Sequence, residues 1–106
     1  ITKPLNNYFN ANMWSIYILR CNDDSLYIGI TNDLVRRQRE HASGKRGAKY
    51  LKGRQPFSLV FSHQIQEKGQ ALKLEHHLKK LPKDKKEYFL SNPNELRDFI
   101  DIFIAE

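Results

Sequence analysis

Two tyrosines ten residues apart, Tyr17 and Tyr27, are the first residues of this chain whose type and spacing could serve chemistry. Each lies in a β-branched and aromatic stretch, Trp14–Cys21 for the first and Leu26–Ile30 for the second. Such stretches, separated by a polar segment, predict two antiparallel strands of a hairpin. A phenol can donate, accept or transfer a proton, although tyrosines in strands are more often simple packing residues.

The length of the hairpin connection decides whether the two phenols meet. A three-residue connection over 22–24 places Cys21 opposite Ser25, and it puts Tyr17 and Tyr27 on one face of the sheet. A two-residue connection would place them on opposite faces. We expect the three-residue connection.

An arginine and a histidine follow on a predicted helix. This helix is expected to begin near Asp33, with Thr31 or Asn32 as its cap, and to end at Gly44. Three residues at helical spacing form the side of this helix that faces the sheet: Leu34, Arg37 and His41. A buried guanidinium needs an anionic partner, so Arg37 predicts either a bound phosphate or a structural salt bridge.

A carboxylate occupies the edge of a later helix. Residues 70–81 carry apolar side chains at helical spacing, and Glu75 lies beside Leu74 at the border of that apolar face. Glu75 is therefore a candidate metal ligand. A surface ion pair with Lys79, four residues on, is the alternative.

The histidines do not predict a zinc site. His76 and His77 are consecutive and so point in different directions, and His63 has no partner at a metal-binding spacing. Cys21 is the only cysteine, which excludes an intrachain disulfide and fits a reducing, cytoplasmic location.

The positive charge is concentrated before the C-terminus. Residues 1–86 carry 17 lysines and arginines against 7 aspartates and glutamates, whereas residues 87–106 carry 1 against 5. Such a distribution suits a polyanionic partner, although a solvated basic surface is the alternative. The predicted phosphate-contacting residues are Arg36, Arg39, Lys45, Arg46, Lys49, Lys52, Arg54 and Lys79.

The remaining elements complete an α+β fold. Residues 57–65 predict a third strand, 83–90 a further helical segment, and Asn92-Pro93-Asn94-Glu95 resembles a capping box that opens a C-terminal helix. We expect a small three-stranded antiparallel sheet flanked by helices.

The chain is predicted to form one domain over residues 13–106, with a C-terminal helical extension over 87–106 and an N-terminal tail or cloning remnant over 1–12. It contains no apolar run long enough to span a membrane. We expect a monomer, with a further protein partner left open.

Taken in order, these residues resemble the GIY-YIG nuclease superfamily, in its small, standalone, excision-nuclease-like branch. The resemblance covers about residues 14–86 and rests on Ser15-Ile16-Tyr17, Tyr27-Ile28-Gly29, the run from Thr31 through Arg37 to His41, and Glu75. Two positions depart from the family: Ser15 replaces a glycine, and Ile30 stands where some members have lysine.

The resemblance implies a metal-dependent endonuclease that hydrolyses phosphodiester bonds in DNA, with RNA not excluded, and with a structure-specific or repair role. By position, Tyr17 and Tyr27 would line the reactive centre, Arg37 would touch the scissile phosphate, His41 would support it, and Glu75 would bind a single Mg²⁺ or Mn²⁺ ion. We expect Tyr17 to accept the proton of the attacking water, which requires neighbouring cations to stabilise its phenolate.

Two other functions use the same basic surface. One is a nucleic-acid-binding module that does not cut, and the other is a scaffold for a nuclease partner. Cleavage of plasmid or branched DNA in the presence of Mg²⁺ or Mn²⁺ would distinguish the enzyme from both.

Overall fold

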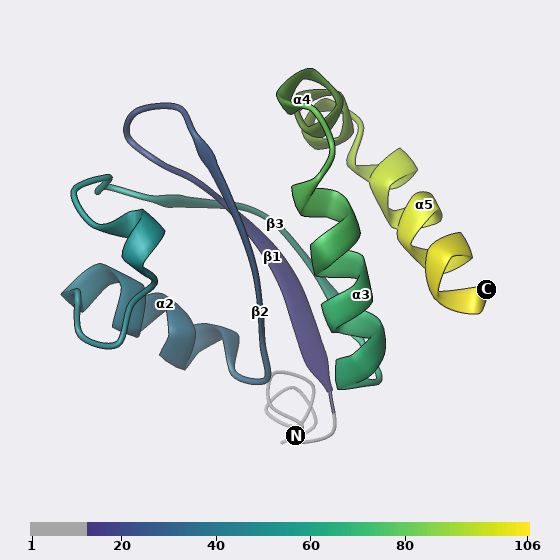
Figure 1. Cartoon of the computed structure of the whole chain (residues 1–106), viewed down its shortest axis with the longest axis horizontal. Helices are drawn as coiled ribbons and strands as arrows, with labels where there is room; N and C mark the ends of the chain where they lie inside the picture. The colour runs from purple at the N-terminus through teal and green to yellow at the C-terminus, as the bar shows by residue number, and fades with distance from the viewer. Residues whose placement is uncertain (1–12) are drawn as a thin grey trace, which may run out of the picture.

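The computed structural model describes residues 13–106, so the predicted N-terminal tail lies outside the described residues. Its sheet contains β1 (Trp14–Arg20), β2 (Leu26–Thr31) and β3 (Ser58–Ile65), all antiparallel and ordered β2-β1-β3 (Figure 1). Helices cover both sides of the sheet, which confirms the predicted α+β class. None of the helices in this part of the chain has the length and apolar character that crossing a membrane requires.

The hairpin has the predicted three-residue connection. Arg20 pairs with Leu26, and the next pair is closed by a hydrogen bond of 2.9 Å from the Cys21 amide to the Ser25 carbonyl. Asp24, the last residue of the turn, has a φ of 68°. This register places both hairpin tyrosines on the same face of the sheet, as predicted.

Helix α2 (Leu34–Ser43) begins and ends near the predicted positions, but its cap differs. Asp33 is the N-cap, and its carboxylate accepts a hydrogen bond from the Arg36 amide. The prediction of Thr31 or Asn32 as the cap is wrong, because the Thr31 hydroxyl instead accepts from the Asp33 amide at 3.0 Å. Gly44 ends the helix with a φ of 80°, as expected of a C-terminal glycine.

Three more helices follow β3, with a short 3₁₀ turn η1 (Lys49–Leu51) before it. They are α3 (Lys68–Lys79), α4 (Lys83–Ser91) and α5 (Pro93–Ala105). The predicted start of α5, with Asn92 as the N-cap and Pro93 as the first helical residue, is confirmed, but the side-chain bonds of a capping box do not form. The Asn92 side chain makes no capping bond and donates to the Tyr88 carbonyl, while Glu95 accepts from the Tyr88 hydroxyl.

Alternate residues of β1 enter two separate cores. Ile16 and Ile18 face α3, α4 and α5, where Leu74 and Ile100 are also fully buried. Because α5 contributes to this core, the C-terminal segment is part of the same packed unit as the sheet. The opposite face of β1 contributes to a smaller core with η1.

The smaller core positions the candidate site. It contains Tyr17, Leu19, Cys21 and Leu51, with Tyr27 and other partly buried residues packed against it. In Figure 1, α2 and η1 lie on one side of the strands and α3 on the other. Helix α3 packs mainly along β2, so side chains from α2 and α3 can meet at the β2 edge.

Candidate active site

The two hairpin phenols differ in their exposure. Tyr17 is completely buried, and its hydroxyl lies 2.8 Å from Nε2 of His41. Tyr27 is partly exposed, with its ring centroid 6.2 Å from that of Tyr17 and 5.6 Å from that of His41. The structure therefore assembles three of the predicted site residues into one aromatic cluster, in which Tyr27 is the phenol that faces solvent.

Gly29 makes room for this cluster. It lies directly opposite Tyr17 in the β1–β2 ladder. A Cβ atom at position 29 would lie 2.6 Å from the Tyr17 hydroxyl oxygen, 2.7 Å from its Cζ and 3.0 Å from the Tyr27 ring. Only glycine therefore lets the Tyr17 ring cross the neighbouring strand, which is a common reason for glycine inside a strand.

Arg37 is aimed at the phenols but is also held by its own helix. Its Nη1 donates to Glu40 Oε1 at 2.8 Å and to the Arg46 carbonyl at 2.6 Å, and the guanidinium also interacts with Tyr17. The side chain is about one quarter exposed, at 27%. The salt-bridge interpretation of Arg37 is confirmed, and its contact with a phosphate stays a prediction.

The assignment of Tyr17 as the proton acceptor is not supported by its environment. Burial, and then the neighbouring Tyr27, hold the pKa of Tyr17 well above its ordinary value, although Arg37 acts in the opposite direction. The prediction required cations to dominate over burial, and burial is the larger effect. The partly exposed Tyr27 is the phenol with more access to water.

Glu75 lies on α3 beside this cluster. Its carboxylate is 19% exposed and pairs with Lys79 at 3.2 Å, as the surface-pair interpretation predicted. The Lys79 ammonium in turn lies 5.9 Å from the centre of the Tyr27 ring. A chain of contacts therefore runs from Glu75 through Lys79 to the phenols.

The part of the chain that the structure describes has no ready-made cluster of metal-ligating side chains. Residues 13–106 contain no group of three histidine, cysteine, aspartate or glutamate side chains that could hold a metal ion. Zinc sites need three or four such ligands, and two of the candidate histidines have other contacts. His77 packs against Phe99 and Phe103, and His63 lies 3.4 Å from Asp101.

Tyr50 extends the aromatic cluster toward solvent. Its ring stacks on Tyr27 with the ring centres 5.8 Å apart, and the Arg54 guanidinium lies over the Tyr50 ring, 4.2 Å from its centre. Arg54 also pairs with Asp23 and donates to Ser25 in the hairpin turn. Arg54 was predicted to contact phosphate, but its contacts in the structure connect Tyr50 to the hairpin.

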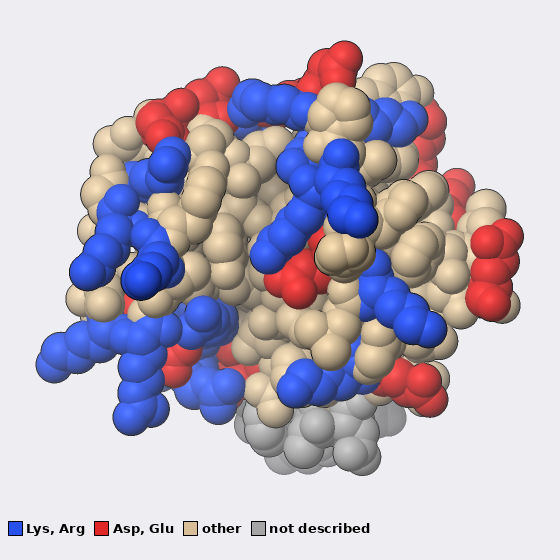
Figure 2. Space-filling view, in the orientation of Figure 1, with Lys and Arg blue, Asp and Glu red and all other residues tan. Residues whose placement is uncertain are grey.

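Two other predicted phosphate-contacting residues are also paired: Arg36 with Glu40 and Asn32, and Lys79 with Glu75. The remaining five are more available. Within residues 13–106, five exposed cationic side chains form no ion pair. They lie on α2, on the loop that follows it and on or directly after η1: Arg39, Lys45, Arg46, Lys49 and Lys52. Figure 2 shows lysine and arginine side chains gathered on this side of the molecule, with a second group near the end of α3.

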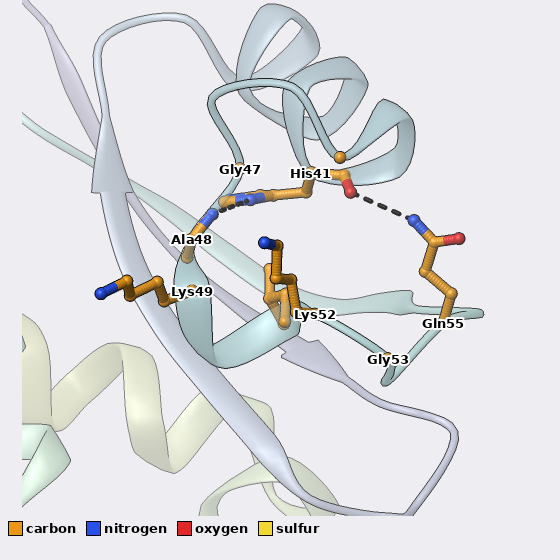
Figure 3. A pocket seen from close by; sticks show the side chains of 9 residues that line it. His41, Gly47, Ala48, Lys49, Lys52, Gly53 and Gln55 are labelled. Atoms are coloured by element: carbon orange, nitrogen blue, oxygen red, sulfur yellow. Dashed lines mark hydrogen bonds between the residues drawn. The ribbon is translucent and has the colours of Figure 1, made fainter.

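A pocket of about 390 Å³ lies behind His41 rather than at the phenols (Figure 3). The end of α2, the loop that follows it and η1 form its walls, with Lys52 and Gln55 side chains at its rim. Tyr17 and Tyr27 do not line it. This pocket therefore borders the aromatic cluster only through His41.

Two residues that support the site were not identified from the sequence. Glu40 holds Arg37, and its spacing of three residues could have signalled an ion pair on the helix. Gln55 donates from Nε2 to the carbonyls of Ala42, at 2.7 Å, and His41, at 3.2 Å, so it holds the end of α2. No sequence pattern marks this long-range bond.

The fold is a small α+β domain in which the buried Tyr17, the partly exposed Tyr27 and Arg37 lie together. Glu75 reaches this cluster through Lys79, and unpaired cations lie on the neighbouring surface, so these groups could bind and neutralise a phosphate ester. The sequence profile of the GIY-YIG catalytic domain matches residues 13–88. The chain belongs to this nuclease family, which confirms the resemblance.

The relatives are small UPF0213 proteins. One from Klebsiella pneumoniae is 44% identical over 87 residues, covering 82% of this chain and 81% of its own length. The UPF0213 protein YazA of Bacillus subtilis is 37% identical over 95 residues, covering 90% of this chain and 89% of its own.

Two solution NMR structures are similar to the fold. The UPF0213 protein BH0048 of Bacillus halodurans is 46% identical, with a TM-score of 0.51, covering 74% of this chain and 83% of that one. The protein EF2693 of E. faecalis is 35% identical, with a TM-score of 0.58, covering 81% and 91% respectively. These names give no substrate or metal.

Proposed function

We propose that this chain is a metal-dependent endonuclease that hydrolyses phosphodiester bonds in DNA, with a preference for branched or damaged structures. The observation that carries the proposal is the meeting of Tyr27, Arg37 and His41 on one side of β2 with the Glu75–Lys79 pair reaching over it. These groups can bind a phosphate, orient a water and neutralise charge, which phosphodiester hydrolysis needs.

Each residue has a proposed task that follows from its exposure. Arg37, fixed at Nη1 by Glu40 and the Arg46 carbonyl, presents its remaining N–H groups to a non-bridging phosphate oxygen. Tyr27 is the phenol at the surface, and it accepts a hydrogen bond from the attacking water. Tyr17 and His41 are buried behind it and act as positioning residues.

Glu75 is the residue that would hold a single Mg²⁺ or Mn²⁺ ion. Such an ion, when bound, neutralises the phosphate and the leaving oxygen. One protein carboxylate is a sufficient anchor, because Mg²⁺ is usually completed by waters and substrate phosphate oxygens. Glu75 must exchange its ion pair with Lys79 for the metal, and Lys79 then remains beside Tyr27 as a further positive charge.

The test measures cutting and binding on the same samples. Wild type and Arg37→Ala are incubated with supercoiled plasmid, a branched duplex and a single-stranded RNA, with Mg²⁺ or Mn²⁺. We expect Arg37→Ala to lose cleavage by roughly 10²–10³-fold, typical of removing one charge-stabilising donor, while DNA binding in Ca²⁺ changes little.

Arg97→Ala is the matched control, since Arg97 lies on α5 and contacts the Phe61 ring. It should cut at the wild-type rate. Cleavage by Arg37→Ala at the rate of this control would refute the assigned centre. Cutting of the RNA alone would replace DNA by RNA as the substrate.

A non-cutting nucleic-acid-binding module is the second candidate. The observation that favours it is that both charged site residues already form ion pairs, Arg37 with Glu40 and Glu75 with Lys79. A salt-sensitive complex with every substrate, with no product in either metal, would favour this function.

The predictions of a monomer and of a cytoplasmic location remain proposals, the second supported by a buried, unpaired Cys21 thiol.

A further inference from the structure

Both ring nitrogens of His41 have a partner. Nε2 lies 2.8 Å from the Tyr17 hydroxyl, and Nδ1 lies 3.3 Å from the backbone nitrogen of Ala48. Figure 3 shows the second bond, between the histidine ring and the loop, along the wall of the pocket behind the site. The residue as a whole is 2% exposed, so water has little access to either nitrogen.

The Ala48 bond determines which nitrogen carries the proton. A backbone N–H group can only donate, so Nδ1 of His41 must offer its lone pair. A neutral imidazole then carries its single proton on Nε2. Protonation of Nδ1, in the other tautomer or in the imidazolium, would place two N–H groups against each other.

The direction of the Tyr17 bond follows from this. Nε2–H donates to the Tyr17 oxygen, so the hydroxyl hydrogen of Tyr17 must point elsewhere. The Tyr27 phenol and the Arg37 guanidinium are its other neighbours, and of these only the phenol can accept a hydrogen bond. A donor chain therefore runs from Ala48 through His41 and Tyr17 toward the exposed Tyr27.

Gly47 brings the loop close enough for this contact. A Cβ atom at position 47 would lie 3.1 Å from the Glu40 carbonyl oxygen and 3.2 Å from the His41 Cα. Both distances are tighter than ordinary van der Waals contact, so a side chain would push the loop away from α2. The Ala48 bond is already near the long end of the hydrogen-bonding range and has little tolerance for such a shift.

We propose that Gly47 and the Ala48 amide are positioning elements that hold His41 neutral and as a donor to Tyr17, so that this histidine does not accept the Tyr17 proton. Burial, and then the positive charge of Arg37, lower the pKa of His41 and so favour the neutral ring, whereas Glu40 raises it. The importance of the donor chain for cleavage rests on the proposed function, but the tautomer itself does not.

The test is ¹⁵N NMR of the wild-type protein with labelled histidine at neutral pH. We expect His41 to show a protonated Nε2 and an unprotonated Nδ1, with the other three histidines as internal references. A proton on Nδ1 of His41 would overturn the proposal. This measurement needs neither metal nor substrate, so its failure is distinct from a failure of the nuclease assay.

A variant then tests the loop. In Gly47→Ala, the midpoint of the His41 titration should rise by about one pH unit, because the bond that favours the neutral ring is lost. Gly69→Ala is the matched control, since a Cβ there meets nothing within 4 Å, and it should leave the midpoint unchanged. An unchanged midpoint in folded Gly47→Ala would contradict the role of the loop.

Discussion

Tyr17 is a polar residue placed where a core residue would normally lie. Its hydroxyl is satisfied by His41, and no buried side-chain nitrogen or oxygen in residues 13–106 lacks a hydrogen-bond partner. A completely satisfied buried polar network fixes the positions of its members. At the scale of single residues, the site is therefore a rigid buried pair that supports an exposed phenol, Tyr27.

Gly29→Ala should disturb this arrangement directly. The added methyl group would overlap the Tyr17 hydroxyl and Cζ, at 2.6 and 2.7 Å. Overpacking of a well-packed site costs typically about 1–3 kcal/mol, and we expect a loss of that size in the free energy of unfolding. Urea denaturation measures it.

The control for this prediction is again Gly69→Ala, at an open helical position. Alanine has a higher helix propensity than glycine, so the control substitution should be neutral or slightly stabilising. A Gly29→Ala variant as stable as the control would mean that the Tyr17 ring can move aside without cost.

At the scale of elements, the sequence predicted the pieces better than their interactions. The strands and helices appear where hydrophobic periodicity placed them, and the odd-numbered hairpin connection brought the two phenols together as argued. The predicted cap of α2 was wrong, and Asn92 is the N-cap of α5 without making the predicted side-chain bond. Several polar side chains near each helix start could serve as the cap. Local sequence does not decide between them when Thr31 and Asn92 find other partners.

The candidate site was predictable only in part. Arg37 and His41 were identified because they lie on the side of the predicted helix that faces the sheet, where a buried guanidinium needs an anionic partner. The bonds made by Gln55 and Ala48 to α2 could not be foreseen, since they join segments whose relative placement depends on the whole fold. The raised pKa of Tyr17 follows from burial, which the alternation of a strand does not quantify.

The link between β1 and α4 gives a pH-dependent prediction. Arg20 binds Glu87 through two bonds of 2.7 and 2.8 Å, and this pairing lowers the pKa of Glu87 to about 2. A carboxyl whose pKa is lower in the folded state adds stability above its unfolded value of about 4.3. That stability is lost as the pH falls from there toward about 2.

Glu87→Gln should therefore be less stable than wild type at pH 6, and the difference should shrink as the pH is lowered to 3. Both side chains are about one third exposed, so we expect only about 1 kcal/mol at pH 6. Urea denaturation at the two pH values measures it. A difference that is constant with pH would show that the pair contributes packing rather than charge.

At the scale of the whole molecule, the charges are divided between two regions. One group of unpaired cations lies over α2, the loop that follows it and η1, and a second group of basic side chains lies near the end of α3. Residues 87–106 carry the acidic excess and form the end of the chain that packs on α3. A polyanion is attracted to the basic region and repelled by the acidic one, so it is oriented toward the candidate site.

The central claim is that α3 supplies the carboxylate of the same site to which the hairpin and α2 supply phenols and a guanidinium. Single-turnover cleavage of a branched duplex, with saturating enzyme and Mg²⁺ or Mn²⁺, tests it most directly for wild type, Glu75→Gln and Glu67→Gln. Glu67 precedes the same helix and is exposed, so it is the matched control. We expect Glu75→Gln to bind the duplex but cut it at least about 10²-fold more slowly, whereas Glu67→Gln cuts at the wild-type rate; equal rates for all three proteins would contradict the claim.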